Sequence, residues 1–265
     1  MNNFSEFPIS TYLKERLHSA RFTLPTPVQA AAIPQALEGK DVLATAQTGT
    51  GKTLAFLVPA IEMLLKQNAP GIAALVLVPT RELAMQVAEQ FNALRGKQLS
   101  PAALVIGGLA EGQQLAAIRN GARLMVATPG RLEDFLKRKL VQFRDLRMLV
   151  LDEADRMLDM GFLPAIRRIV GVLPSERQTM CFSATLEASV AHLVQDYLRN
   201  PVRLAFGSIL KPSENVRLQA FEVVANRKQD LLHHLLAKEK GSCLVFARTK
   251  RGAERIARSL ARDGF

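Results

Sequence analysis

Eight consecutive residues carry the most specific chemistry in the sequence, between an apolar run expected to form a strand and a segment with helical spacing. They read Ala46-Gln47-Thr48-Gly49-Thr50-Gly51-Lys52-Thr53. Small residues let backbone N–H groups close around phosphates at the positive end of a helix dipole. Lys52 can then reach phosphate oxygens and the Thr53 hydroxyl can bind Mg²⁺. Ala46 stands where the general pattern has Gly, but the strand, loop and helix together disfavour an ordinary turn.

A second candidate site follows the apolar run 148–151, where the sequence reads Asp152-Glu153-Ala154-Asp155. A carboxylate at a strand end can hold Mg²⁺ through water, and a neighbouring one can orient and deprotonate an attacking water. Taken alone, such a group would more often mark a helix N-terminus, where acidic side chains interact favourably with the dipole. The phosphate loop upstream favours the metal site.

Three further short motifs follow predicted strands. They are Pro79-Thr80-Arg81-Glu82-Leu83, Gly107-Gly108 and Thr128-Pro129-Gly130-Arg131. Because the carboxyl ends of parallel strands meet at one edge of a sheet, these motifs are expected on one rim. Hydroxyl groups, bare backbone and Arg contact phosphate and sugar without reading bases, which predicts nucleic-acid binding that is largely independent of sequence. Taken singly, Thr80 or Thr128 could instead cap a helix.

The elements that must position these residues are short apolar runs alternating with longer segments of helical spacing. The runs cover 42–45, 73–78, 102–106, 124–127, 148–151 and 179–182, and the helical segments include 53–66, 81–94, 130–137 and 163–172. Each run is too short for a helix and too continuously apolar for a half-exposed strand. The pattern predicts an α/β fold, with a mostly parallel sheet flanked by helices and ligands beyond the carboxyl ends of the strands.

The alternation stops near Leu204, and the polar stretch 208–216 is typical of a linker. The expected domains are therefore 1–207 and 217–265. In the second, the pattern predicts strands at 218–224 and 243–247 and helices at 229–237 and 253–261. Two strands are at or below the size at which a domain folds alone, so the chain is expected to be cut off part-way through its second domain.

Composition narrows the class of partner. The sequence has 35 Lys and Arg against 24 Asp and Glu, a net charge of +11 that suits nucleic acid or an anionic membrane surface. Its apolar runs fall short of the roughly 18 residues of a membrane span, and its start has no signal-peptide shape, so we expect no membrane association and a cytoplasmic location. Cys181 and Cys243 are too few for a disulfide framework or a zinc site, and both are expected to be buried in strands.

The order of these motifs resembles the DEAD-box family of ATP-dependent RNA helicases, which is named after the residues found here at 152–155. Phe22, Pro25, Thr26, Pro27 and Gln29 resemble the adenine-recognising Q motif, with Phe4 as its upstream aromatic and Arg21 where Gly is usual. Ser183-Ala184-Thr185 resembles the motif that couples ATP hydrolysis to strand separation. Leu244-Val245-Phe246 with Arg248-Thr249-Lys250 resembles the first motif of the second domain. The stretches 152–185 and 248–250 are most similar to the bacterial RhlE-type branch.

The resemblance implies a RecA-like domain followed by an incomplete second one, and an RNA helicase and ATP phosphohydrolase that remodels short RNA duplexes or RNA–protein complexes. ATP and Mg²⁺ are the implied cofactors and RNA the implied partner. The implied catalytic residues are Lys52, Asp152, Glu153, Asp155, Ser183 and Thr185. The implied nucleotide contacts are Phe22, Pro25, Gln29 and the phosphate loop, with Thr53 and Asp152 at the metal. An amide such as Gln29 can match both the amino group and a ring nitrogen of adenine, although a solvent-exposed glutamine is the alternative.

Two other functions stay open at this point. One is an RNA-binding module that uses nucleotide only as a structural ligand, and the other is an ATPase that moves proteins or DNA, which Gln29 and the RNA motifs disfavour. In the family, the second domain later supplies an arginine finger that these 265 residues do not contain. We therefore expect this chain to bind ATP and RNA with little unwinding. Partner proteins from ribosome assembly or RNA decay are both compatible with the sequence.

Overall fold

The computed structural model describes residues 3–67, 70–186, 188–206 and 217–265. It divides the chain into two compact units, Met1–Leu210 and Lys211–Phe265. The predicted linker at 208–216 lies outside the described residues, so the linker and the predicted domain limits stay predictions.

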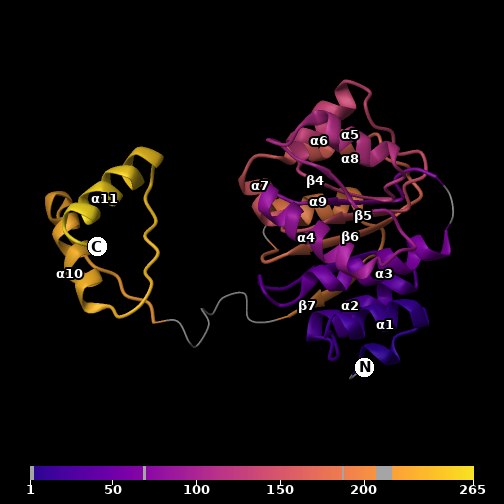
Figure 1. Ribbon diagram of the computed structural model, residues 1–265, viewed down its shortest axis with the longest axis horizontal. Coiled ribbons are helices and arrows are strands. Elements are labelled where there is room, and N and C mark those ends of the chain that lie inside the picture. The colour runs from indigo at the N-terminus through magenta and orange to yellow at the C-terminus, as the bar shows by residue number, and fades with distance from the viewer. Residues whose placement is uncertain (1–2, 68–69, 187, 207–216) are drawn as a thin grey trace. The chain divides into compact units, whose positions relative to one another are not determined.

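The first unit, coloured indigo to orange in Figure 1, is built on a seven-stranded sheet. The order of its strands is β3-β4-β2-β5-β6-β1-β7. All neighbouring strands run parallel. The strands are β1 (Val42–Thr45), β2 (Ala74–Leu77), β3 (Ala103–Val105), β4 (Leu124–Ala127), β5 (Met148–Leu151), β6 (Gln178–Ser183) and β7 (Val202–Ala205). The six predicted runs form β1 to β6 within one residue at each end, which confirms the predicted parallel α/β sheet.

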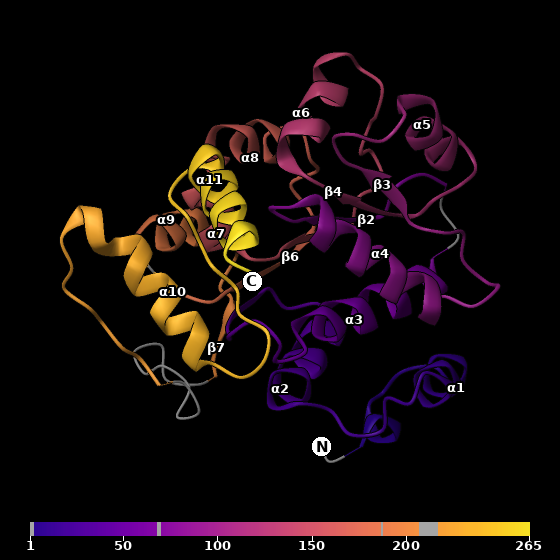
Figure 2. The same ribbon diagram turned by 60° about the vertical axis from the view of Figure 1, so that its left-hand side comes forward.

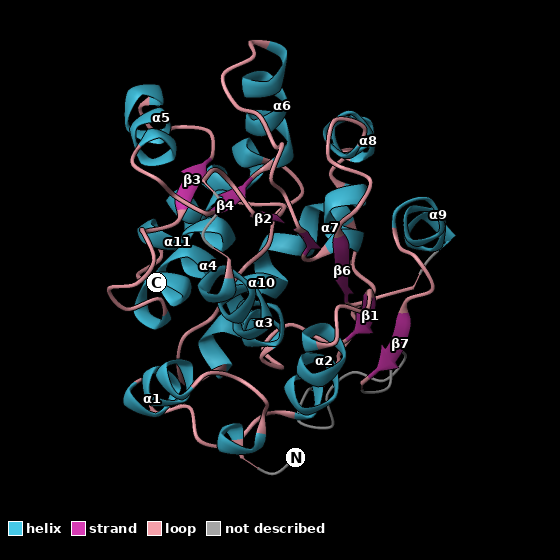
Figure 3. Cartoon of the chain, turned by 90° about the vertical axis from the view of Figure 1, so that its right-hand side faces the viewer, coloured by secondary structure: helices cyan, strands magenta, loops and turns pink. Residues whose placement is uncertain are grey.

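Helices cover both faces of this sheet (Figures 2 and 3). One face packs against η1 (Phe4–Glu6), α1 (Thr11–Ser19), α2 (Pro27–Leu37), α3 (Lys52–Lys66) and α4 (Arg81–Leu94). The other packs against α5 (Glu111–Arg119), α6 (Pro129–Lys137), α7 (Ala154–Asp159), α8 (Leu163–Val170) and α9 (Ala188–Tyr197). No helix among the described residues is both long enough and apolar enough to cross a bilayer.

The two hydrophobic cores follow from the alternation of side chains along each strand. In β1, Val42 and Ala44 face one core whereas Leu43 faces the other, because successive side chains of a strand point to opposite faces. Burial on both faces explains why these strands read as continuous apolar runs rather than alternating ones. The polar residues that follow each strand are left at the carboxyl edge, where the predicted motifs lie.

The second unit contains η2 (Ala225–Arg227), α10 (Lys228–Lys238) and α11 (Lys250–Arg262). The two helices were predicted, but the strands predicted at 218–224 and 243–247 are wrong, since residues 217–265 contain no strand. A strand requires hydrogen bonds to a neighbour, and no described segment of this unit offers an edge to these residues. Leu244 and Phe246 are accordingly 81% and 88% exposed.

The two cysteines differ in burial because only one of them lies in a strand. Cys181 is buried in β6, as predicted. Cys243 is exposed and lies outside any strand, so the prediction that it is a buried strand residue is wrong.

Candidate functional site

The phosphate loop connects β1 to α3 at the carboxyl edge of the sheet. Ala46 is buried at its start, whereas residues 47–49 are exposed and the chain then turns into the helix. Gly49 and Gly51 have φ values of 86° and 90°, which the loop requires and which glycine adopts without strain. Lys52 begins α3 earlier than predicted, and its buried ammonium donates to the Ala46 carbonyl at 2.9 Å. An ammonium has three N–H donors, so this contact leaves two directions for phosphate oxygens.

Gln29 ties this loop to the preceding helix. It occupies the third position of α2, where its Oε1 accepts from the Thr26 backbone N–H at 2.9 Å as part of a capping box. Its Nε2 donates to the Gly51 carbonyl at 2.9 Å. Gln29 is only 3% exposed, which removes the alternative of a solvent-exposed glutamine. Its amide links the segment predicted to recognise adenine directly to the phosphate loop.

The other residues of that segment lie between α1 and α2. Phe22 is half-buried against the core and Pro25 is half-buried nearby in sequence. Arg21 has a φ of 62°, in the left-handed region that favours glycine. Phe4, predicted as the upstream aromatic, is buried, and its backbone N–H donates to the Thr23 carbonyl at 3.2 Å.

The acidic motif lies between β5 and α7, across from the loop. Asp152 is only 2% exposed, and this burial raises the pKa of its carboxyl to about 6, although the positive charge of Lys52 acts in the opposite direction. The phosphate loop follows β1 and the acidic motif follows β5, and both strands pair with β6. The two motifs therefore share one site at the carboxyl edge of the sheet. Glu153 follows with a φ of 51°, and its carboxylate pairs with Arg156 at 3.0 Å. The motif does begin a helix, so the N-terminal position and the shared site occur together.

Asp155 connects the acidic motif to the segment that follows β6. Its Oδ2 accepts from the backbone N–H groups of Ala184 and Thr185 at 3.0 Å each, and from the Thr185 hydroxyl at 3.2 Å. The Ser183 hydroxyl accepts from the Asp155 backbone N–H at 3.3 Å. The Ser183 carbonyl in turn accepts from the Ala46 N–H at 3.0 Å. Hydrogen bonds therefore run from the acidic motif through Ser183 to the phosphate loop.

A groove of about 570 Å³ opens at the ends of β2, β3 and β4. All of the predicted RNA-contacting residues line it except Gly108 and Pro129. Pro129 is buried in the first turn of α6. Gly108 lies against Arg81, since an added Cβ would sit 2.4 Å from the guanidinium. The prediction that these motifs share one rim is confirmed for the residues that line the groove.

The two threonines of the groove also begin helices, as the alternative interpretation required. Thr80 caps α4, because its hydroxyl accepts from the Leu83 N–H at 3.3 Å. Thr128 occupies the corresponding position of α6, but its side chain makes no capping hydrogen bond.

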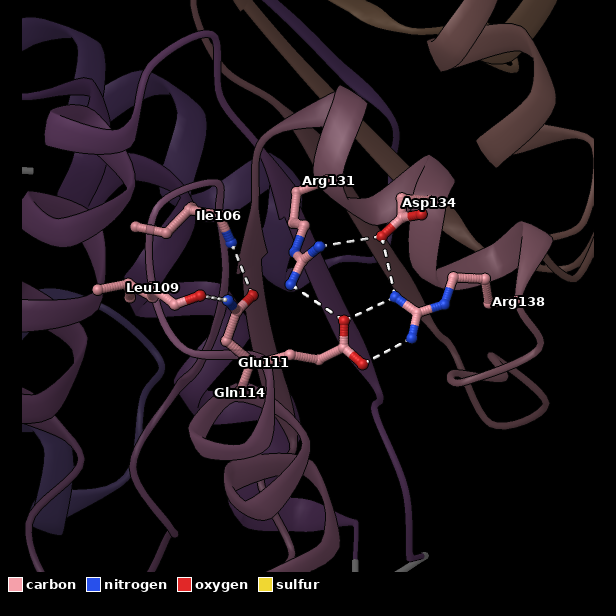
Figure 4. Close-up of polar contacts among 7 residues, drawn as sticks. All are labelled: Ile106, Leu109, Glu111, Gln114, Arg131, Asp134 and Arg138. Atoms are coloured by element: carbon pink, nitrogen blue, oxygen red, sulfur yellow. Dashed lines mark hydrogen bonds and ion pairs between the residues drawn. The ribbon is translucent and has the colours of Figure 1, made fainter.

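Sequence reasoning missed several charged and polar residues beside this groove. Figure 4 shows Glu111 and Gln114 of α5 together with Arg131 and Asp134 of α6 and Arg138, which caps the C-terminus of α6. Arg131, Asp134 and Arg138 are three and four residues apart, which places them on one helix face. This spacing is a signal that the sequence contains. The partnership with Glu111 joins two separate helices and has no local signal.

Comparisons with known proteins agree with this arrangement. Residues 26–193 match the family described as DEAD/DEAH box helicase. The ATP-dependent rRNA helicase RRP3 of Candida albicans is 41% identical over 256 residues, covering 96% of this chain and 48% of that protein. DEAD-box ATP-dependent RNA helicase 30 of Arabidopsis thaliana is 38% identical over 275 residues, covering 100% of this chain and 46% of that protein.

A crystal structure of a DEAD box protein from the hyperthermophile Methanococcus jannaschii superposes with a TM-score of 0.74 at 33% identity. The match covers 100% of this chain and 71% of the archaeal one. This chain spans about half the length of the two curated relatives named above.

Proposed function

This chain belongs to the DEAD/DEAH box helicase family, and from that membership we propose that it forms the ATP-binding and RNA-binding part of an ATP-dependent RNA helicase. The observation that carries the proposal is the hydrogen-bonded connection from the acidic motif through Ser183 to the phosphate loop, on the same sheet edge as the groove. Nucleotide hydrolysis and nucleic-acid binding thereby share one rigid edge.

The donor set around Lys52 fits a nucleotide with its divalent cation. Among the described residues, no group of three or more acidic, His or Cys side chains is arranged to hold a metal ion by itself. Mg²⁺ typically binds through one or two carboxylates, water and the substrate phosphates. Thr53 and Asp152 would hold Mg²⁺, which when bound neutralises charge on the phosphates. Lys52 would bind phosphate oxygens, and Phe22, Pro25 and Gln29 would contact the base.

The residues of the acidic motif take different roles in this proposal. Glu153 would orient the attacking water and accept its proton, because its carboxylate directly follows Asp152 in the sequence and a carboxylate can act as a general base. Asp155 would position the Ser183-Ala184-Thr185 segment through the hydrogen bonds that it accepts. A change at the γ-phosphate would then reach this segment through Asp155 and Ser183.

RNA would bind along the groove through contacts to phosphate and sugar. Thr80, Thr128 and Arg131 supply hydroxyl and guanidinium donors without a surface that reads base edges. Binding should accordingly be largely independent of sequence.

Finer assignments rest on the residues alone. We place the protein in the bacterial RhlE-type branch on the stretches 152–185 and 248–250, although the named relatives are eukaryotic and archaeal. We also propose a cytoplasmic location, and partner proteins from ribosome assembly or RNA decay.

ATPase assays of this chain with single-stranded RNA, single-stranded DNA and no nucleic acid test the function. We expect Mg²⁺·ATP binding by calorimetry, lost in Lys52→Ala, and RNA-dependent turnover that is slow, because a missing arginine finger typically costs a factor on the order of 10³ to 10⁵ in rate. Glu153→Gln should keep nucleotide binding and stop the remaining turnover.

The assay also separates the alternatives. Binding of RNA and ATP with no turnover under any condition would favour an RNA-binding module that uses nucleotide as a structural ligand. Equal stimulation by DNA would favour a nucleic-acid motor without RNA preference. Nucleotide affinity that is unchanged in Lys52→Ala would remove the phosphate loop from the proposal, and duplex unwinding by this chain alone would contradict the expected slow turnover.

A further inference from the structure

Two carboxylates and two guanidiniums form a closed network at the edge of the groove (Figure 4). Glu111 holds Arg138 through two hydrogen bonds of 2.6 and 2.7 Å, and its Oε2 also accepts from Arg131 at 3.3 Å. Asp134 accepts from Arg131 at 3.0 Å and from Arg138 at 3.4 Å. The positive charge expected at this rim is therefore neutralised by side chains of the protein itself.

The Arg131 guanidinium is fixed in position, but not all of its N–H groups are hydrogen-bonded to the protein. Its guanidinium stacks 4.6 Å from the centre of the Phe135 ring, which fixes its plane. Its Nε–H is buried without an acceptor among the described residues. A guanidinium offers five N–H donors, so the two carboxylates do not satisfy it.

The position of Glu111 relative to the groove is fixed by Gln114, one turn further along α5. The buried Gln114 amide accepts from the Ile106 N–H at 3.1 Å and donates to the Leu109 carbonyl at 2.9 Å. These two hydrogen bonds attach the loop that contains Gly107 and Gly108 to α5. Glu111 is thereby held over α6 rather than carried on a free surface loop.

The network is open to solvent and to a ligand. The side chains of Arg138, Asp134 and Glu111 are 46%, 42% and 33% exposed. The hydrogen bonds from Arg138 lower the pKa of the Glu111 carboxyl, so it remains ionised at neutral pH. Exposed ion pairs of this kind contribute little to the stability of a fold, because water and salt screen them. Another anion can therefore displace the carboxylate at low cost.

Since RNA phosphates present the same charge and a bidentate geometry to guanidinium groups, we propose that Arg138 joins Arg131 in the RNA-binding surface and that Glu111 is the carboxylate that RNA displaces to reach both. The inference rests on the proposed RNA binding in the groove. Glu111 then lowers RNA affinity and limits binding to ligands that compete for both arginines.

The test compares an ion pair that belongs to the network with an ion pair that lies away from the groove. Glu111 bonds to Arg131 and Arg138 bonds to Asp134, and both of these partners line the groove. Glu133 and Arg168 instead form a pair of 2.7 Å with each other, between α6 and α8, and neither lines the groove. Glu111→Gln and Glu133→Gln each remove one negative charge, and Arg138→Ala and Arg168→Ala each remove one positive charge. The control pair therefore accounts for changes in net charge.

Binding of a labelled single-stranded oligo(U) RNA is measured by fluorescence anisotropy over a NaCl series, with thermal unfolding as the check that each variant folds. Glu111→Gln should bind RNA more tightly and steepen the log–log salt slope by about 0.7 for each additional phosphate neutralised. Arg138→Ala should weaken binding, and in the Glu111→Gln background it should return the slope toward that of the parent. Both control variants should stay close to the parent.

The proposal requires RNA affinity to rise in Glu111→Gln and to fall in Arg138→Ala. If Glu111→Gln weakens binding or leaves it unchanged, or matches Glu133→Gln, the carboxylate is not displaced by RNA and the inference is wrong. If Arg138→Ala binds as the parent does, Arg138 is not part of the surface. A parent chain that does not bind oligo(U) at any salt concentration would instead contradict the proposed function.

Discussion

Arg21 and Lys139 each occupy a left-handed backbone position at the end of a helix, with φ values of 62° and 56°. At Arg21 the Phe22 N–H donates to the Leu17 carbonyl, and at Lys139 the Leu140 N–H donates to the Phe135 carbonyl. These are the bonds of a helix end that usually carries glycine. The departure from Gly at residue 21 therefore carries a conformational cost.

We predict that Arg21→Gly and Lys139→Gly each stabilise the chain by about 0.5 to 1 kcal/mol, because relief of a left-handed strain of about 1 to 2 kcal/mol outweighs the entropy of the unfolded glycine. Urea unfolding measures the difference. Ser19→Gly, at the last residue of α1, serves as the control and should destabilise, because this position is right-handed helix rather than left-handed. A loss of stability in both substitutions would show that the entropy of the unfolded glycine outweighs the relief of strain.

Asp152 is a buried carboxyl whose pKa of about 6 lies above its usual 3.8. A raised pKa means that the folded state binds the proton more tightly than the unfolded state. The cost to folding is therefore full above pH 6 and disappears as the pH falls toward 4.

Asp152→Asn should stabilise the nucleotide-free chain at pH 7 by at most about 3 kcal/mol, since each pKa unit corresponds to about 1.4 kcal/mol. The gain should vanish near pH 4. Denaturant unfolding at both pH values measures it, with exposed Asp159→Asn of α7 as the control for charge. An equal gain at pH 4 would mean that packing rather than ionisation is responsible. Nucleotide hydrolysis should be lost in Asp152→Asn only.

At the scale of elements, the contact between α2 and the phosphate loop requires a residue without a Cβ at position 51. A Cβ at Gly51 would lie 2.4 Å from the Gln29 Nε2, whereas a Cβ at Gly49 would meet nothing within 4 Å. Both glycines have φ near 90°. They therefore separate backbone strain from steric conflict.

Gly49→Ala should cost only the strain, about 1 to 2 kcal/mol, and Gly51→Ala should cost more. Combining each with Gln29→Ala forms two double-mutant cycles, read by urea unfolding. We expect coupling of at least about 0.5 kcal/mol for Gly51 and Gln29, and none for Gly49 and Gln29. Additivity in both cycles would show that α2 shifts to accept the new methyl group.

At the scale of the whole molecule, the two units differ in how much they bury. The first has two cores that enclose both faces of its sheet. In residues 217–265, Ser259 is the one buried residue among those described, and no hydrophobic side chain of that unit is fully buried. Stability scales with buried apolar area, so the second unit has little to hold its helices.

Hydrogen exchange should therefore separate the units. Amides in β1, β2 and β5 should be protected to the limit set by global unfolding, whereas those of α10 and α11 should exchange far faster. Mass spectrometry of peptides from both units measures this directly. Equal protection would mean that the second unit gains its stability from contacts beyond its own residues.

The sequence by itself determined the strands of the sheet and the order of the motifs that follow them. Buried parallel strands such as 42–45 and 148–151 can be recognised in the sequence as continuous apolar runs between helical segments. It also placed Thr80, Thr128 and Arg131 on one rim, since the carboxyl ends of parallel strands meet at one edge. It failed at 218–224 and 243–247, where apolar residues have strand character but a strand forms only when a partner supplies hydrogen bonds.

Only the tertiary structure decided the pairing of residues far apart in the chain. The bonds of Gln29 to Gly51 and of Asp155 to Thr185 join segments that periodicity leaves independent. The burial that raises the pKa of Asp152 and the hold of Glu111 on Arg131 likewise depend on which helices and strands pack together. Local propensity acts over a few residues along the chain, whereas charge neutralisation, desolvation and steric fit act through space.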